Sequence, residues 1–195
     1  MKRLVTTAIL FLFLSTAWSG DLDDAYAASA RKDNAVALEK FRSAAAKGDT
    51  EGMYGLGAMY EHGTGVPRNP AAAEKWYRLA AERGDVGART KLGSLYVDGV
   101  IVKRDYIEAA KWYRLAAAQA DRFAQQELGV LYFKGQGVSQ NHVKAHMWFN
   151  LGAIKGREAA INGRNDVAKL MTTQQIADAQ RLASACQARN FKGCD

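Results

Sequence analysis

Apolar and small residues recur along this chain at helical spacing, and the same arrangement returns three times. In the first copy Gly52, Leu56 and Tyr60 lie four residues apart, which places them on one face of a helix. The same stripe returns at intervals of 36 residues, as Ala88/Leu92/Tyr96 and Ala124/Leu128/Tyr132. A second stripe in each copy contains Trp76, Trp112 or Trp148. The pattern predicts three tandem pairs of helices.

The residues that start and stop the first helix also recur at a fixed phase. An aspartate, a strong N-cap residue, precedes that helix as Asp49, Asp85 and Asp121. A glycine, which readily adopts the left-handed conformation at a helix C-terminus, follows it as Gly63, Gly99 and Gly135. Inside the helix a further glycine recurs as Gly57, Gly93 and Gly129. Because a glycine inside a helix costs about 1 kcal/mol relative to alanine, we expect another helix to approach closely there.

The fixed positions spell A-x3-L-G-x2-Y-x2-G-x-G-V, then A-x2-W-Y-x-L-A-A-x2-G-D, over residues 49–156. This pattern resembles the Sel1-like repeat, a relative of the tetratricopeptide helix pair. The resemblance implies an all-α fold, a right-handed α-α superhelix (solenoid) whose units bury their apolar faces against neighbours. The second copy departs from the pattern in its loop, where Val100-Ile101 replaces Thr64-Gly65. The predicted structural anchors are Leu56, Gly57, Tyr60, Trp76, Leu92, Gly93, Tyr96, Trp112, Leu128, Gly129, Tyr132 and Trp148.

The segments around the repeats complete a predicted order of six parts. Residues 1–19 resemble a secretory signal peptide, with Lys2 and Arg3 before an apolar run and cleavage near Ser19. A retained membrane anchor is the alternative, although the run is shorter than the ~20 residues that span a bilayer. We expect a degenerate helix pair as an N-terminal cap at 20–48, repeats at 49–84, 85–120 and 121–156, and capping helices at 157–195. The last segment contains a capping box, Thr172 to Gln175.

Charge and cysteine content narrow the possible compartments and partners. The chain carries a net charge of +7, and removal of Lys2 and Arg3 would leave +5. Nucleic acid is an unsuitable partner for an exported protein, and the mature form is expected to have no transmembrane segment. Cys186 and Cys194 are the only cysteines, and an even pair in an exported chain suggests a disulfide. Two unpaired thiols on a frayed tail are the alternative.

No pattern of catalytic or metal-binding residues stands out. His142 and His146 are four residues apart, but no third ligand lies nearby, so we expect surface histidines and no metal site. The glycines of the loops follow helices and recur with the repeat, so they predict turns and not a nucleotide site. No nucleophile motif is present. We therefore predict a protein that is not an enzyme and uses no cofactor.

The phases that vary between repeats are the candidates for recognition. On the first helices, which line the concave side in this architecture, the variable sets are Tyr54/Thr90/Gln126, Ala58/Ser94/Val130 and Glu61/Val97/Phe133. An apolar group in a concave groove can dock a peptide or a partner helix. Coverage by neighbouring helices or by the C-terminal cap is the alternative. The predicted partner-binding residues are Tyr54, Val97, Val130 and Phe133.

The expected function is that of an exported protein-interaction or assembly scaffold at a bacterial cell envelope, periplasmic or secreted. Binding or hydrolysis of cell-wall material or β-lactams is the alternative, by analogy with cysteine-rich Sel1-repeat relatives. The cysteines that those relatives pair inside each repeat are absent here. A secreted factor directed at a host is a third possibility. The identity of the protein or peptide partner does not follow from the sequence.

Overall fold

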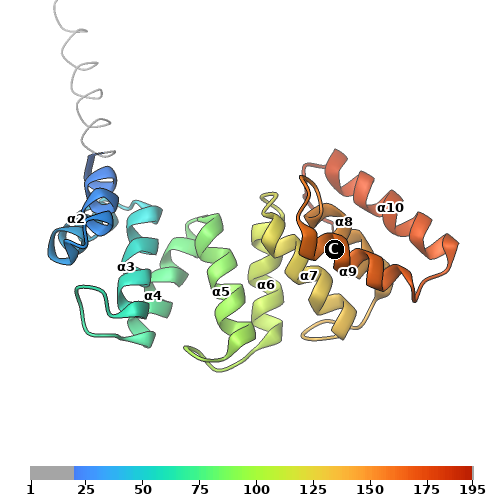
Figure 1. The fold of residues 1–195 in the computed structure, drawn as a ribbon, viewed down its shortest axis with the longest axis horizontal. Coiled ribbons are helices and arrows are strands. Elements are labelled where there is room, and N and C mark those ends of the chain that lie inside the picture. Colours follow the sequence, from blue (N-terminus) through green and yellow to red (C-terminus); the bar gives the residue numbers. More distant parts are fainter. Residues whose placement is uncertain (1–19, 195) are drawn as a thin grey trace, which may run out of the picture. The chain divides into compact units, whose positions relative to one another are not determined.

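The repeats form pairs of helices joined by glycine-containing loops (Figure 1). The computed structural model describes residues 20–194, and the predicted signal peptide lies outside these residues. Within the described range the secondary structure is helical, with no strand. The all-α prediction is therefore confirmed. The chain divides into two compact units, with the boundary between Asp85 and Val86.

The first unit contains the N-terminal helix pair and the first repeat. A helix at 20–30 is followed by α2 (Asn34–Ala46), α3 (Thr50–His62) and α4 (Pro70–Glu82). Asp21 fastens the first of these helices to α2, because its carboxylate accepts hydrogen bonds from Lys40, Ser43 and Lys47. These contacts hold the pKa of Asp21 at about 2. The N-terminal pair packs against the first repeat through the contact of α2 with α3.

The second unit contains two repeats and the closing helices. Its helices are α5 (Val86–Asp98), α6 (Tyr106–Ala117), α7 (Arg122–Lys134), α8 (His142–Gly152), α9 (Glu158–Ala168) and α10 (Thr173–Ala188). The first helices α5, α7 and α9 are neighbours in this order. Both α9 and α10 pack against α8. A disulfide joins Cys186 at the end of α10 to Cys194, with a Cα–Cα distance of 5.2 Å.

The capping residues predicted for α3, α7 and α10 perform the expected role in the structure. The Asp49 carboxylate accepts hydrogen bonds from two amides of the first turn of α3, and Asp121 accepts one from Ala124. Gly63 and Gly135 end α3 and α7 in the left-handed conformation. The capping box of Thr172 and Gln175 is present at the start of α10. The aspartate and threonine side chains satisfy amides of the first turn, and the N–H of each glycine donates to a carbonyl of the last turn. The helix itself leaves these groups without partners.

An aromatic ring from each second helix packs against the glycine of its first helix. A Cβ added at Gly57 would lie 2.7 Å from the ring of Tyr77. At Gly93 the nearest ring atom, of Tyr113, would be 2.5 Å away, and at Gly129 the nearest atom of Phe149 would be 2.7 Å away. All three rings are buried. The recurring glycine therefore admits a ring, whereas the sequence had suggested the close approach of a helix.

The tryptophans that precede these rings differ in burial. Trp112 and Trp148 are buried, whereas Trp76 is half-buried. Among the other predicted anchors the leucines and glycines are buried, and Tyr60 is half-buried. At the recurring glycine the nearest ring is that of the residue after the tryptophan. The indole is therefore not the ring that fills this space.

Candidate partner-binding surface

Some of the residues at the variable positions of the first helices have an intramolecular role. They contact the hydroxyl of the aromatic ring that packs on the recurring glycine of the same helix. The Tyr77 hydroxyl donates a hydrogen bond to a Glu61 carboxylate oxygen at 2.7 Å. In the next repeat the Tyr113 hydroxyl lies 3.1 Å from the Ser94 hydroxyl. Burial raises the pKa of Tyr77 and of Tyr113, so both hydroxyls remain protonated. In each of these repeats a variable phase therefore supplies the hydroxyl's partner.

The third repeat has a phenylalanine at this position, and the variable phases change with it. Phe149 carries no hydroxyl, and the two phases that hold Ser94 and Glu61 in the other repeats are occupied by Val130 and Phe133. A polar group at these phases would have no hydroxyl to bind, and burial of an unpaired polar group is costly. The apolar character of Val130 and Phe133 thus follows in part from the packing of Phe149.

The structure divides the predicted partner-binding residues between the two units. Tyr54 lies on α3 in the first unit, with its ring centroid 5.3 Å from that of Tyr77. Val97 lies on α5 and Val130 and Phe133 lie on the adjacent α7, in the second unit. All four side chains are half-buried. The Phe133 ring lies 5.8 Å from His142, between centroids, so one side of it contacts the next helix.

Tyr54 lines an apolar pocket of about 240 Å³ in the first unit. Tyr26 and Phe41 form one wall, with their rings edge to face and their centroids 5.4 Å apart. Phe41 in turn packs on the backbone of α3, because a Cβ at Gly55 would lie 2.5 Å from its ring. Neither Tyr26 nor Phe41 is among the partner-binding residues predicted from the sequence, although Phe41 lies 36 residues before Tyr77. The complete lining is Tyr26, Ser29, Phe41, Tyr54, Gly55, Ala58, Met59, His62 and Thr64.

Negative charges act on Tyr26, one of the residues that line this pocket. Tyr26 is 47% exposed, and its pKa is raised by partial burial and by the negative charges of Glu51, Asp85 and Asp49. The two units also differ in net charge. Residues 20–85 contain eleven acidic and nine basic side chains, whereas residues 86–195 contain nine acidic and sixteen basic ones. The pocket therefore lies in the acidic part of a basic protein.

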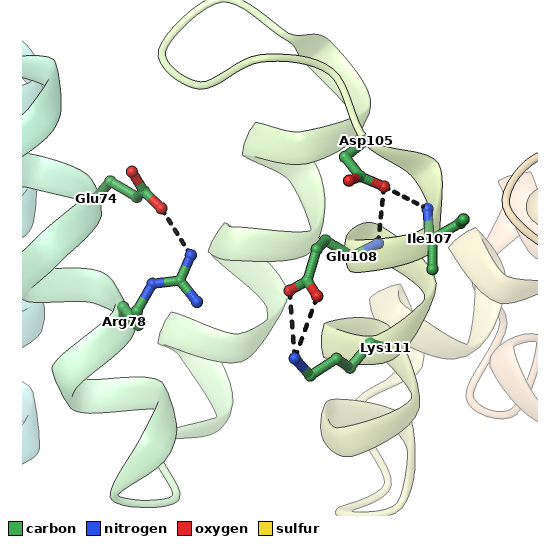
Figure 2. A network of polar contacts seen from close by, with 6 residues as sticks. All are labelled: Glu74, Arg78, Asp105, Ile107, Glu108 and Lys111. Carbon is green, nitrogen blue, oxygen red and sulfur yellow. Dashed lines mark hydrogen bonds and ion pairs between the residues drawn. The ribbon is translucent and has the colours of Figure 1, made fainter.

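Several basic side chains of the second helices are engaged with acidic or aromatic neighbours in their own unit. Figure 2 shows Arg78 bound to Glu74 on α4 and, on α6, Lys111 bound to Glu108. The corresponding distances are 2.7 and 3.2 Å. Exposed pairs of this kind stabilise by only about 0.2–1 kcal/mol. Each pair nevertheless places a negative charge beside a positive one on the outer surface of the helix.

A polar hollow of about 530 Å³ lies in the second unit, between the start of α7 and the start of α9. Arg122, Lys155 and Arg157 contribute its positive charge. Arg157 donates a hydrogen bond to Gln126 at 2.6 Å, and its guanidinium lies 5.0 Å from the Phe123 ring centroid. The hollow is open and mostly polar, so it offers little apolar contact to a partner.

The expectation for His146 was wrong. His146 is 3% exposed, because α8 is packed against α9 and α10 as well as α7. Burial, together with the positive charge of Arg164, lowers the pKa of His146. His142, in the first turn of α8, is half-buried. Within residues 20–194 no group of three or more histidine, cysteine, aspartate or glutamate side chains is arranged to hold a metal ion.

The helices of the described range are also too short or too polar to cross a membrane, since none of them combines sufficient length with sufficient apolar character.

Comparison with known proteins identifies the repeat. A Sel1 repeat protein from Oxalobacter formigenes is 35% identical and has a TM-score of 0.62, over 66% of this chain and 97% of that chain. A second similar structure is c5321, a protective antigen of uropathogenic Escherichia coli strains with an SLR fold. It is 27% identical, with a TM-score of 0.58, over 80% of this chain. The match spans 42% of c5321, less than half its length. A search of curated proteins found no match.

The family model for the Sel1 repeat matches residues 50–85, 86–121 and 122–156, which together are more than half of the chain. The matched segments coincide with the helix pairs α3–α4, α5–α6 and α7–α8. The chain belongs to the Sel1 repeat family.

Proposed function

We propose that this protein is a non-enzymatic scaffold that binds a protein or peptide through its first helices, after export to the bacterial cell envelope. Sel1 repeat proteins are generally protein-interaction scaffolds, which supports the binding role. The observation that carries the proposal is the open apolar pocket beside Tyr54. Side chains that serve only to pack one repeat on the next normally fill the space between them. An apolar pocket that stays open is therefore available to a partner.

The arrangement favours a peptide over a reacting small molecule. Apolar pockets on a helical surface bind the anchor residues of partner segments. The lining contains aromatic and small side chains and one histidine, His62. His62 lies in the last turn of α3 and is exposed. The lining has no nucleophile paired with a base, which acyl transfer or hydrolysis by the protein itself would require.

Two observations support export. The first is the apolar segment Leu4–Leu14 after Lys2 and Arg3, which has the organisation of a signal peptide. The second is the disulfide between Cys186 and Cys194, since disulfides persist mainly in oxidising compartments. By this proposal the mature protein works in the periplasm or outside the cell.

Capture of partners from an envelope extract tests the binding role. The bait is the full chain, compared with Tyr54→Ser in the first unit and Val97→Ser in the second. Ile107→Ser is the matched control, because Ile107 is 69% exposed on the second helix α6. We expect the first two variants to lose most of the captured partner and the control to retain it. Equal capture by all four proteins would contradict the assignment of the surface.

Export and the absence of catalysis have separate tests. Cell fractionation of the full chain should place it in the periplasm or medium, with no titratable thiol. A chain lacking residues 4–14 should remain in the cytoplasm with two titratable thiols. Turnover of nitrocefin by the purified protein would contradict the non-enzymatic role and favour the β-lactam alternative.

A further inference from the structure

The apolar pocket of the first unit is built from rings that hold one another in place. Tyr26 is packed against Phe41, and Tyr54 is packed against Tyr77. Phe41 and Tyr77 are themselves buried and rest on the α3 backbone at Gly55 and Gly57. The walls are therefore formed before a partner arrives, and a formed site loses less conformational entropy on binding.

The size of the pocket limits what it can hold. Its volume of about 240 Å³ is smaller than the ~300–1,000 Å³ typical of sites for drug-sized ligands or cofactors. It suits one apolar side chain. The rest of the partner would then run across the rim, where Tyr26 is half-exposed and His62 is exposed.

The charges at the rim indicate what lies beside that side chain. Three carboxylates act on Tyr26, and that of Glu51 acts most strongly. Glu51 and Asp49 lie at the start of α3, and Asp85 lies at the end of the first repeat. An acidic partner segment would be repelled by these carboxylates, whereas lysine or arginine would be attracted to them. Most of the basic side chains after residue 19 belong to the second unit, with sixteen in residues 86–195 and nine in residues 20–85.

We propose that the pocket lined by Tyr26, Phe41 and Tyr54 binds an apolar side chain of a peptide that carries basic residues next to it. This inference rests on the scaffold function proposed above and specifies the partner's chemistry at the first unit. The apolar side chain fills the pocket against Ala58 and Met59. The adjacent lysine or arginine lies over the carboxylates at the start of α3.

The chain itself supplies a variant that fills the pocket without disturbing the helix. Ala58 lines the pocket on α3, and the third repeat carries Val130 at the same phase of α7. Ala58→Val is therefore compatible with the repeat. Glu51→Gln removes one rim charge. Glu39→Gln is its control, because Glu39 is an exposed carboxylate on α2 in the same unit.

The test is titration of the ¹⁵N-labelled full chain with three capped peptides, followed by NMR. The peptides are acetyl-Phe-Lys-Lys-amide, acetyl-Phe-Glu-Glu-amide and acetyl-Ala-Lys-Lys-amide. We expect the first to shift the amide signals of Tyr54, Ala58 and their neighbours at millimolar concentration. The other two should bind at least about tenfold more weakly, as expected for loss of a buried apolar side chain or of charge attraction.

The variants then separate the two parts of the proposal. Ala58→Val should weaken the first peptide about tenfold or more, since the space for its ring is filled. Glu51→Gln should weaken it about two- to fivefold, and increasing salt should do the same. Glu39→Gln should have no effect.

Three results would overturn the inference: equal binding of the acidic peptide, shifts confined to the second unit, or no shift with any peptide. Failure here is distinguishable from failure of the scaffold function. If the envelope partner is still captured, and captured equally by Ala58→Val, only the pocket assignment is wrong. If the envelope extract yields no partner that depends on Tyr54 or Val97, the scaffold proposal fails as well.

Discussion

The packing of rings on glycines makes a specific prediction for Gly129→Ala. Inside an ordinary helix this substitution stabilises by about 1 kcal/mol, because alanine has the higher helix propensity. Here the new Cβ would lie 2.7, 2.8 and 2.9 Å from three atoms of the Phe149 ring. Real carbon contacts are about 3.5–4.0 Å, so the ring or the helix must move by most of an ångström.

Phe149 has little room for such a movement. On its other side the ring lies against α9, where a Cβ at Gly163 would be 2.6 Å from it. The ring is therefore held between two helix backbones. Overpacking of a core costs about 1–3 kcal/mol, and the upper part of this range applies to an enclosed ring. After the gain in helix propensity, we expect a net loss of about 1–2 kcal/mol in the free energy of unfolding.

The assay is urea unfolding and thermal melting, followed by circular dichroism and tryptophan fluorescence. The expected decrease in Tm is about 2–8 °C for a chain of this size. Gly163→Ala should behave in the same way. Asn162→Ala is the control, because Asn162 is exposed on the same helix, and it should be neutral or slightly stabilising.

A second substitution tests the mechanism directly. In the Gly129→Ala background, Phe149→Leu should cost less than it does in the wild type, because the smaller side chain relieves the contact. We expect a coupling free energy of about 0.5–2 kcal/mol between the two sites. The reasoning is refuted if Gly129→Ala is as stable as the wild type, or more stable.

Three further predictions concern the second unit. The folded pKa of His146 lies below its ordinary value of 6.5, so as the pH falls through 6.5 the unfolded chain takes up the proton first and stability declines. Urea unfolding at pH 7.5 and pH 5 should show this decline in the free energy of unfolding for the wild type and for His142→Gln, and a smaller decline for His146→Gln. An equal decline in all three proteins would contradict the prediction. Cys194→Ser should lower the stability of the end of α10 by up to about 2–3 kcal/mol, seen as faster hydrogen exchange there, and unchanged exchange would count against a role for the disulfide. Thr172→Ala should cost about 1 kcal/mol by removing the N-cap of α10, whereas Thr173→Ala, one residue along, should cost less; the reverse order in thermal melts would show that the cap is unimportant.

The helices and their limits could be predicted from the sequence, because the signals that set them are local. Asp49 and Asp121 cap the helices that they precede, and Gly63 and Gly135 end them. Each of these interactions joins residues within about four positions, so a period of 36 residues is sufficient to place the paired helices of the three repeats. The recurring glycine inside the first helix indicated the close approach of a helix, whereas the structure places an aromatic ring there.

The tertiary structure decided which side chains make that contact and which remain exposed. The sequence pattern favoured Trp76 as the core anchor of the first repeat, but the packing of α4 on α3 brings Tyr77 onto Gly57. His146 is buried because α9 and α10 pack on α8, outside the period of the repeat. The pocket beside Tyr54 needs Tyr26 and Phe41, from the degenerate helix pair. Periodicity identifies the apolar face of one helix at a time. Burial and pockets depend on which other helix packs against that face, and those contacts join residues that are far apart in the sequence.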